Sequence, residues 1–189
     1  MSTALRPPMD RDAFLAWENR QELRYEFDGF APVAMTGRTV EHAIIQRNLI
    51  TALTNRLRGK PCQAFGSELK ILVDGSIRYP DAFVACAPIA RGSLVVADPV
   101  VIFEILSPAT AAIDRIVKNR EYCATPSVQR YVLLEQIRPA ATVFAREGTD
   151  WIGRIFDADA MLALPEIGID LPLAELYEGI AFPDPPEDD

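Results

Sequence analysis

The chain contains Val100-Val-Ile-Phe-Glu-Ile-Leu106, a nearly unbroken apolar run of the kind found in β-strands that are buried on both faces. A helical pattern follows at 110–124, and a second apolar run at 131–134 predicts another buried strand. Two buried strands with a helix between them predict a parallel pair inside a mixed sheet. This unit is the centre of the predicted fold.

The segments around this unit predict further strands and helices. Upstream, the patterns indicate a helix at 10–19, a hairpin within 24–35, a helix at 40–58, and strands at 63–73 and 77–87 on either side of an Asp-Gly turn. Downstream, they indicate strands at 141–146 and 151–156 and a short helix at 173–177. The order predicts an α/β (α+β) fold with a single domain over 1–181. Residues 182–189 form an acidic, Pro-rich tail that we expect to be disordered.

The composition excludes several classes of protein. The 189 residues are 49% hydrophobic, and no apolar run approaches the roughly 20 residues that span a bilayer. The first residues lack the order of a signal peptide, so we expect a soluble, cytoplasmic protein without a membrane partner. The sequence contains no Gly-rich phosphate loop, and we therefore expect no nucleotide cofactor.

The cysteines and the histidine exclude several kinds of catalytic and metal site. Cys62, Cys86 and Cys123 are spaced too widely for a disulfide framework or a zinc knuckle. His42 is the only histidine, which excludes a multi-histidine metal site. A Ser-His-Asp enzyme would depend on this residue, but the sequence has no Gly-x-Ser-x-Gly elbow. Any chemistry must therefore depend on carboxylates, Lys, Arg or Tyr.

The charge of the chain is uneven along the sequence. The net charge of -8 argues mildly against a nucleic-acid partner. Most of the excess acid lies in residues 131–189, however, whereas the first two-thirds of the chain are nearly neutral and contain more Arg than Lys. A locally basic groove in that part of the protein is compatible with this distribution.

Two carboxylates lie where the pattern predicts burial. Glu104 is in the middle of the apolar run, and Asp81 shares a strand face with Tyr79 and Phe83. A buried carboxylate is costly unless it is paired, protonated or bound to a metal. Glu104 could bond to an Arg or an amide and Pro80-Asp81 could be a local kink, but two such acids on neighbouring strands indicate a site. Two carboxylates, together with waters and a substrate phosphate, are ligands that Mg²⁺ prefers.

A lysine near the two acids would stabilise the charge that develops during phosphoester hydrolysis. Lys118 and Lys70 are the candidates. Asp114, Lys118 and Tyr122 lie four residues apart on one side of the 110–124 helix, away from its apolar stripe. This spacing alone predicts a solvated face with an ion pair.

Three further polar residues have ordinary explanations. Glu41 and His42 begin the long helix. The helix dipole alone explains an acid there, because it stabilises a carboxylate by roughly a few tenths of a kcal/mol. Glu26, between Tyr25 and Phe27, fits an exposed position of an alternating strand. None of the three supports a functional role from its position alone.

Several motifs occur in an order that resembles a known family. They are Arg24-Tyr-Glu-Phe-Asp-Gly29, Glu41-His42, Tyr79-Pro-Asp81, Phe103-Glu-Ile-Leu-Ser-Pro108, Asp114…Lys118…Tyr122, Pro126-Ser-Val-Gln-Arg-Tyr-Val132 and Leu171-Pro-Leu-Ala-Glu-Leu-Tyr177. Together they resemble a large bacterial family of small restriction endonucleases, formerly catalogued as a domain of unknown function. That family belongs to the PD-(D/E)XK, restriction-endonuclease-like superfamily, and the resemblance covers about residues 10–180.

The resemblance implies a mixed β-sheet flanked by helices, with an acid pair on adjacent strands. Asp81 resembles the Asp of the PD half of the superfamily motif, and Glu104 resembles the acid of the second half. By this analogy both would bind Mg²⁺, with Mn²⁺ as a substitute, and a metal-activated water would attack a DNA phosphodiester. Glu26 and Glu41, with His42 beside the latter, resemble additional residues near the metal.

The chain departs from the superfamily pattern at two positions. The superfamily has a lysine two residues after the second acid, where this chain has Leu106. In the family that the chain resembles, the lysine lies on the following helix, which makes Lys118 its counterpart and leaves Lys70 as the second candidate. Phe30 stands where relatives commonly carry an acid, which argues against an extended acidic site but not against Asp81 and Glu104.

Three functions remain open from the sequence. The first is a Mg²⁺-dependent DNA endonuclease, expected as a homodimer because a double-strand cut needs two sites. The second is a catalytically inactive nuclease-fold protein that binds or regulates, which the missing local lysine and the charge of -8 favour. The third is a metal-dependent hydrolase of smaller phosphoesters, which would tolerate an acidic surface better than a duplex binder.

Overall fold

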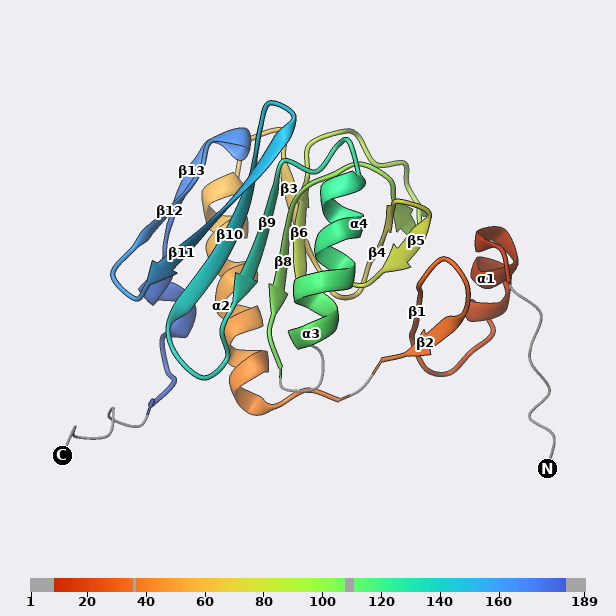
Figure 1. Ribbon diagram of the computed structural model, residues 1–189, viewed down its shortest axis with the longest axis horizontal. Helices are drawn as coiled ribbons and strands as arrows, with labels where there is room; N and C mark the ends of the chain where they lie inside the picture. Colours follow the sequence, from red (N-terminus) through yellow and green to blue (C-terminus); the bar gives the residue numbers. More distant parts are fainter. Residues whose placement is uncertain (1–8, 36, 108–110, 183–189) are drawn as a thin grey trace.

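The computed structural model describes residues 9–35, 37–107 and 111–182, and within them the chain forms a central sheet, a smaller sheet and a strand pair (Figure 1). The central sheet has the order β11-β10-β9-β8-β6-β3. Its strands are β3 (Gln63–Gly66), β6 (Ala82–Ala85), β8 (Pro99–Ile105), β9 (Arg130–Leu134), β10 (Ala140–Glu147) and β11 (Asp150–Asp157). Strands β8 and β9 are parallel while their neighbours are antiparallel, which confirms the predicted parallel pair in a mixed sheet.

The smaller sheet has the order β2-β1-β5-β4-β7 and lies beside the central one. Its strands are β1 (Tyr25–Phe27), β2 (Pro32–Ala34), β4 (Lys70–Val73), β5 (Ser76–Arg78) and β7 (Val95–Val96). The strand pair consists of β12 (Met161–Leu164) and β13 (Ile169–Pro172), which have no counterpart in the sequence prediction.

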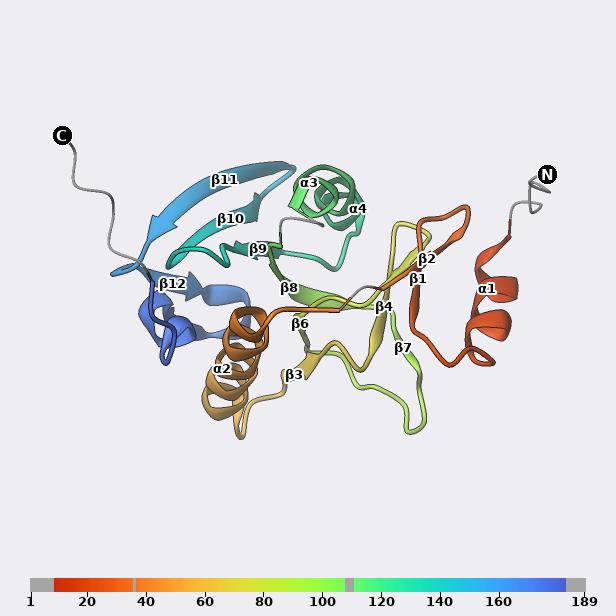
Figure 2. The same cartoon turned by 90° about the horizontal axis from the view of Figure 1, so that it is seen from below.

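Helices cover both faces of the central sheet, as Figure 2 shows for α2 on one side and α3 and α4 on the other. The helical elements are α1 (Arg11–Glu18), α2 (Val40–Leu57), α3 (Ala111–Ile113), the π-helical segment η1 (Asp114–Lys118), α4 (Asn119–Ala124), and the 3₁₀ segments η2 (Pro165–Ile167) and η3 (Leu173–Tyr177). Alternation along β8 sends Phe103 and Ile105 into the core under α2, and Ile102 and Leu106 into the core under α4. Glu104 therefore belongs to the face that α3, η1 and α4 cover.

The two predicted strands around Asp74-Gly75 are each divided between the two sheets. The turn itself is confirmed, with both residues at positive φ between β4 and β5. The chain then leaves the smaller sheet after Arg78 and enters the central sheet at Ala82. Pro80, which cannot donate a ladder hydrogen bond, lies at this crossing. Asp81 thus sits directly before β6 instead of inside one long strand.

The helix predicted at 110–124 is present over its described residues, but it faces the opposite way. Asp114, Lys118 and Tyr122 are buried, whereas the apolar Ile116 of the same helical segment is 71% exposed. The π-helical turn η1 lies in the middle of this helix, and such turns are frequent at functional sites. The surface position that periodicity predicts for Lys118 is therefore wrong, because the polar side meets charged partners inside the protein. Residue Thr110 lies outside the described residues.

A disulfide joins Cys62 and Cys86, so the expectation that the cysteines form no disulfide is wrong for this pair. Cys62 precedes β3 and Cys86 follows β6, and Gln63 is paired with Ala85 in the antiparallel ladder between these strands. The ladder therefore brings the two cysteines face to face. Their wide separation in sequence conceals a proximity that only strand pairing creates. Cys123 is a free thiol.

The remaining expectations concern the hairpin and the other helices, the C-terminal tail and membrane-spanning segments. The predicted hairpin within 24–35 and the helices at 10–19, 40–58 and 173–177 are present, the last as a 3₁₀ segment. Of the predicted tail at 182–189, residues 183–189 lie outside the described part of the chain. Among the described residues, none of the helices combines the length and the apolar character that crossing a membrane requires.

Candidate active site

Strand pairing brings Asp81 and Glu104 together. The antiparallel ladder of β6 and β8 begins with Ala82 opposite Phe103, and Asp81 and Glu104 are the next residues along the two segments. The carboxylate of Asp81 accepts a hydrogen bond from the backbone N–H of Ile105, the residue after Glu104 in β8. Asp81 is 2% exposed and Glu104 is 3% exposed. The two acids that the sequence singled out are therefore buried neighbours.

The two carboxylate oxygens of Asp81 have different surroundings. Oδ2 accepts a hydrogen bond from the backbone N–H of Ile105 at 2.7 Å, and Nε2 of His42 lies 3.1 Å from it. Oδ1 is buried and accepts no hydrogen bond from the described residues, but it forms an ion pair with Nη1 of Arg38. Gln46 of α2 adds a hydrogen bond of 2.8 Å to the backbone carbonyl of Asp81. The carboxylate is thus held by two contacts at Oδ2 and faces the partly exposed guanidinium of Arg38 with Oδ1.

Glu104 is held by side chains from the helix that crosses over its strand. Oε1 accepts hydrogen bonds from Nζ of Lys118 at 2.9 Å and from the hydroxyl of Tyr122 at 2.8 Å. Nζ of Lys118 also lies 3.1 Å from Asp114 and 3.4 Å from Glu26. The ammonium therefore lies among three carboxylates from three different elements.

The charge cluster continues into the smaller sheet. Glu26 of β1 accepts from the backbone N–H of Tyr79 at 3.0 Å and pairs with Arg78 of β5 at 3.2 Å. The guanidinium of Arg78 also donates to both oxygens of Glu121, at 2.6 and 2.7 Å. Glu26 is thus buried next to the acid pair, and the exposed position that alternation favoured for it is wrong.

Burial dominates the electrostatics of Glu104. It raises the pKa of this carboxyl to about 7, against the opposing effect of Lys118 and with help from the negative charges of Asp114 and Glu26. For Lys118 burial alone would lower the pKa, but the carboxylates of Glu104, Glu26 and Asp114 outweigh it and raise the pKa. The lysine is therefore charged at neutral pH, while Glu104 is poised to gain or lose its proton.

His42 is neutral at physiological pH. Burial, followed by the positive charge of Arg38, lowers the pKa of its imidazole to about 4. A neutral ring can donate from Nε2 to Asp81 only in the tautomer that leaves Nδ1 as an acceptor. Nδ1 is buried and has no hydrogen-bond partner among the described residues.

The site has a negative charge that suits a divalent cation. Five carboxylates form ion pairs with three cationic side chains in this cluster. The carboxylates are Glu26, Asp81, Glu104, Asp114 and Glu121, and the cations are Arg38, Arg78 and Lys118. Two negative charges remain when all five acids are ionised and His42 is neutral. Asp81 and Glu104 are the two acids that could hold a metal, and Mg²⁺ needs only one or two carboxylates when waters and phosphate complete its shell. Within the described residues, no group of three or more His, Cys, Asp or Glu is arranged to hold a metal ion.

Two candidates from the sequence have surroundings other than those of Asp81 and Glu104. Lys70 is buried, but its Nζ pairs with Glu18 at 2.5 Å, and the hydroxyl of Tyr79 donates to the same carboxylate. Glu41 is exposed at the start of α2. Of the two lysines, Lys118 is the one beside Glu104.

Arg38 and Gln46 are contacts of Asp81 that the sequence analysis missed. Both belong to α2 or to the loop before it, more than thirty residues from Asp81 in sequence. An arginine in a polar loop and a glutamine on a helix carry no pattern that marks them as partners of a distant acid. No sequence signal could have identified them.

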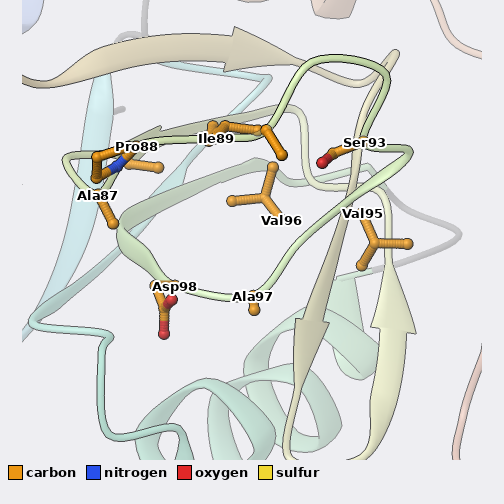
Figure 3. Close-up of a pocket in the computed structure, with 10 residues that line it drawn as sticks. Ala87, Pro88, Ile89, Ser93, Val95, Val96, Ala97 and Asp98 are labelled. Carbon is orange, nitrogen blue, oxygen red and sulfur yellow. The ribbon is translucent and has the colours of Figure 1, made fainter.

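A separate hollow of about 190 Å³ lies between the loop after β6 and the segment that leads through β7 into β8 (Figure 3). Its walls include Pro88, Ile89, Val95 and Val96, and Asp98 is the only ionisable residue among the ten that line it. None of the residues around Asp81 and Glu104 contributes to it. The hollow is therefore unrelated to the charge cluster.

Comparisons with known proteins agree with one another. The model of the Uma2 family, described as "Putative restriction endonuclease", matches residues 11–174. An uncharacterized protein of Synechocystis sp. is 32% identical over 180 residues, which cover 93% of this chain and 95% of that protein. The crystal structure of a protein described as a putative nuclease belonging to DUF820, from Anabaena variabilis, superposes with a TM-score of 0.75 at 20% identity. The superposition covers 90% of this chain and 98% of the Anabaena protein. At 20% identity this likeness shows a shared fold.

Proposed function

Since the chain belongs to the Uma2 family of restriction-endonuclease-like proteins, we propose that it is a Mg²⁺-dependent endonuclease that hydrolyses DNA phosphodiester bonds. The observation that carries this proposal is that the carboxylate of Asp81 bonds to the backbone N–H of Ile105, next to Glu104 in β8, while Lys118 donates to Glu104. These are the residue types and the strand arrangement that the resemblance to the PD-(D/E)XK superfamily implies.

Each of the three residues has a role that its surroundings support. Asp81 and Glu104 would hold the cation, because both are buried carboxylates at the point where the chain enters β6 beside β8. A Mg²⁺ ion bound there would polarise the phosphodiester and lower the pKa of a water molecule. Lys118 keeps its proton and would stabilise negative charge that develops on the phosphate. His42 and the N–H of Ile105 would orient Asp81.

The position of Lys118 also bears on the inactive alternative. The missing lysine after Glu104 was the main sequence argument for a protein without catalysis. A lysine that reaches the same carboxylate at 2.9 Å from another element weakens that argument. The net charge of -8 still favours the hydrolase of smaller phosphoesters as a second candidate.

Calorimetric titration of Mn²⁺ into the wild-type protein and into Glu104→Gln tests the metal site. We expect saturable binding to the wild type and none to the variant. Glu41→Gln is the matched control, because it removes an exposed carboxylate on the neighbouring helix and should leave binding unchanged. Wild-type protein that binds no Mn²⁺, alone or with DNA present, would contradict the proposal.

Cleavage of supercoiled plasmid DNA tests the reaction. Asp81→Asn should abolish Mg²⁺-dependent cleavage while the circular dichroism spectrum is unchanged, and Glu41→Gln should cleave normally. The affinity for DNA should fall linearly on a log–log plot against salt, because phosphate contacts release counterions. Affinity that is independent of salt, together with hydrolysis of a small phosphodiester, would favour the second candidate. A double-strand cut would require two sites, so we also propose a homodimer, which light scattering would detect.

A further inference from the structure

Arg38 occupies the side of Asp81 that a metal ion would need. Nη1 of Arg38 forms an ion pair with Oδ1 of Asp81 and lies 3.4 Å from Nε2 of His42. The negative charges of Glu104, Glu26 and Asp114 act on the same guanidinium. Arg38 is therefore the cation that faces both proposed metal ligands from outside the core.

The contact with Arg38 is easier to exchange than the other contacts of the site. Arg38 precedes α2 in a loop, and its side chain is 29% exposed, whereas the side chain of Lys118 is 8% exposed and contacts three carboxylates. The fixed donors, Ile105 N–H and His42, both lie at Oδ2 of Asp81. Apart from the ion pair with Arg38, no contact of the described residues holds Oδ1. Release of Arg38 would thus leave Asp81 in place with one oxygen available.

A guanidinium and a divalent cation compete for Oδ1, because two positive charges at one oxygen repel one another. The planar fork of an arginine, in contrast, matches the oxygens of a phosphate. The side chain of Arg38 is the most exposed of the three cationic side chains of the site, so it could leave the carboxylate and meet a phosphate that approaches from the solvent.

We infer that Arg38 is an exchangeable counter-ion of Asp81: it neutralises this carboxylate while no divalent cation is bound, and it binds a phosphate oxygen of the substrate once the cation takes Oδ1. This inference rests on the metal site of the proposed function and adds a residue that links metal binding to substrate binding.

Titration of Mn²⁺ into the metal-free full-length protein tests the first half. Arg38→Gln removes the competing cation, and we expect Mn²⁺ to bind roughly tenfold more tightly than to the wild type, the size of one charge-assisted hydrogen bond. Arg154→Gln is the control for net charge, because Arg154 is exposed and pairs with Glu147 on the distant β10–β11 hairpin. It should bind Mn²⁺ as the wild type does. Equal or weaker binding to Arg38→Gln would overturn the inference.

Binding of a short labelled DNA duplex, followed by fluorescence anisotropy, tests the second half. With EDTA, Arg38 is engaged with Asp81, so Arg38→Gln should leave DNA affinity within twofold, about the effect of one exposed charge. With Ca²⁺, the variant should bind DNA roughly tenfold more weakly than the wild type. An equal loss under both conditions would show that Arg38 is an ordinary phosphate contact and would overturn the inference.

A second variant covers the case in which Arg38→Gln is unstable. Arg38→Lys keeps the charge but not the planar fork, so it should retain wild-type Mn²⁺ affinity and lose part of the Ca²⁺-dependent DNA affinity. Full DNA affinity in Arg38→Lys would overturn the inference.

Metal binding that is abolished by Glu104→Gln but unaffected by Arg38→Gln would leave the proposed metal site intact and contradict this inference alone. Tighter Mn²⁺ binding and Ca²⁺-dependent DNA affinity without any cleavage would support the inference and contradict the nuclease.

Discussion

Nζ of Lys118 lies 2.9 Å from Oε1 of Glu104, although the lysine belongs to the π-helical segment η1 and the acid to strand β8. The superfamily pattern has its lysine two residues after the acid on the same strand, where this chain has Leu106. Here the ammonium reaches the carboxylate through space from the helix that crosses over the sheet. The π-helical turn buries Asp114 together with Lys118 and so adds a second acid to the lysine.

Replacement of Lys118 should destabilise the protein and abolish activity. Lys118→Met leaves three buried carboxylates without their shared cation, and loss of one partner of a buried pair typically costs about 3–5 kcal/mol of unfolding free energy. Urea denaturation would measure the loss. Arg115→Gln, three residues earlier, breaks the exposed ion pair with Glu135 and should change the unfolding free energy by less than about 1 kcal/mol. Similar stabilities for the two variants would contradict the buried cluster.

The raised pKa of Glu104 predicts a pH dependence of stability without metal. Its folded pKa of about 7 exceeds the ordinary value of 4.5, so the folded protein keeps a proton that the unfolded chain releases. The contribution of this proton to the free energy of unfolding is fully present below pH 4.5 and is lost as the pH rises through 7. In EDTA, the wild type should lose up to about 3 kcal/mol relative to Glu104→Gln between pH 4.5 and 8, since one pKa unit corresponds to about 1.4 kcal/mol. Denaturation curves at several pH values measure it. Parallel curves for the two proteins would show that Glu104 titrates normally.

The imidazole of His42 should act on Asp81 as a positioning group. His42→Ala removes the donor at Oδ2, and loss of a group that orients a metal ligand typically lowers metal affinity by about 10- to 100-fold. His42→Gln restores an N–H donor and should recover part of the Mn²⁺ affinity. Calorimetry on both variants separates orientation from packing, because a purely structural role would give no recovery in the glutamine variant.

The disulfide between Cys62 and Cys86 should stabilise the oxidised protein. It closes a loop with a sequence separation of 24, for which the chain-entropy relation gives about 3 kcal/mol. Reductant should therefore lower the Tm of the wild type, and the double variant Cys62→Ser/Cys86→Ser should have the lower Tm with or without reductant. Thiol labelling of denatured, unreduced protein should detect one free thiol, that of Cys123. Detection of three would show that the bridge does not form.

The amino-acid sequence by itself determined the local elements and the two acids. The apolar run around Glu104 became β8, the next run became β9, and the two strands pair in parallel as predicted. Asp81 and Glu104 were recognisable because a carboxylate in an apolar strand is anomalous wherever its partners lie. Hydrophobic periodicity and turn residues act over a few neighbouring positions, so they can be read from the chain directly.

Tertiary structure alone decided which groups meet these acids. Periodicity predicted Lys118 at the surface, but its helix turns its polar side inward because Glu104 and Glu26 lie there, and Asp114 of the same segment adds a third partner. Arg38 reaches Asp81 and Cys62 reaches Cys86 across long stretches of sequence. Contacts of this kind depend on strand register and on how helices pack across the sheet, and neither is encoded in any single segment. In sequence, a helix with a buried charged face has the same pattern as a helix with a solvated face. The two differ only in the folded protein, where acids from other elements pair with the buried lysine.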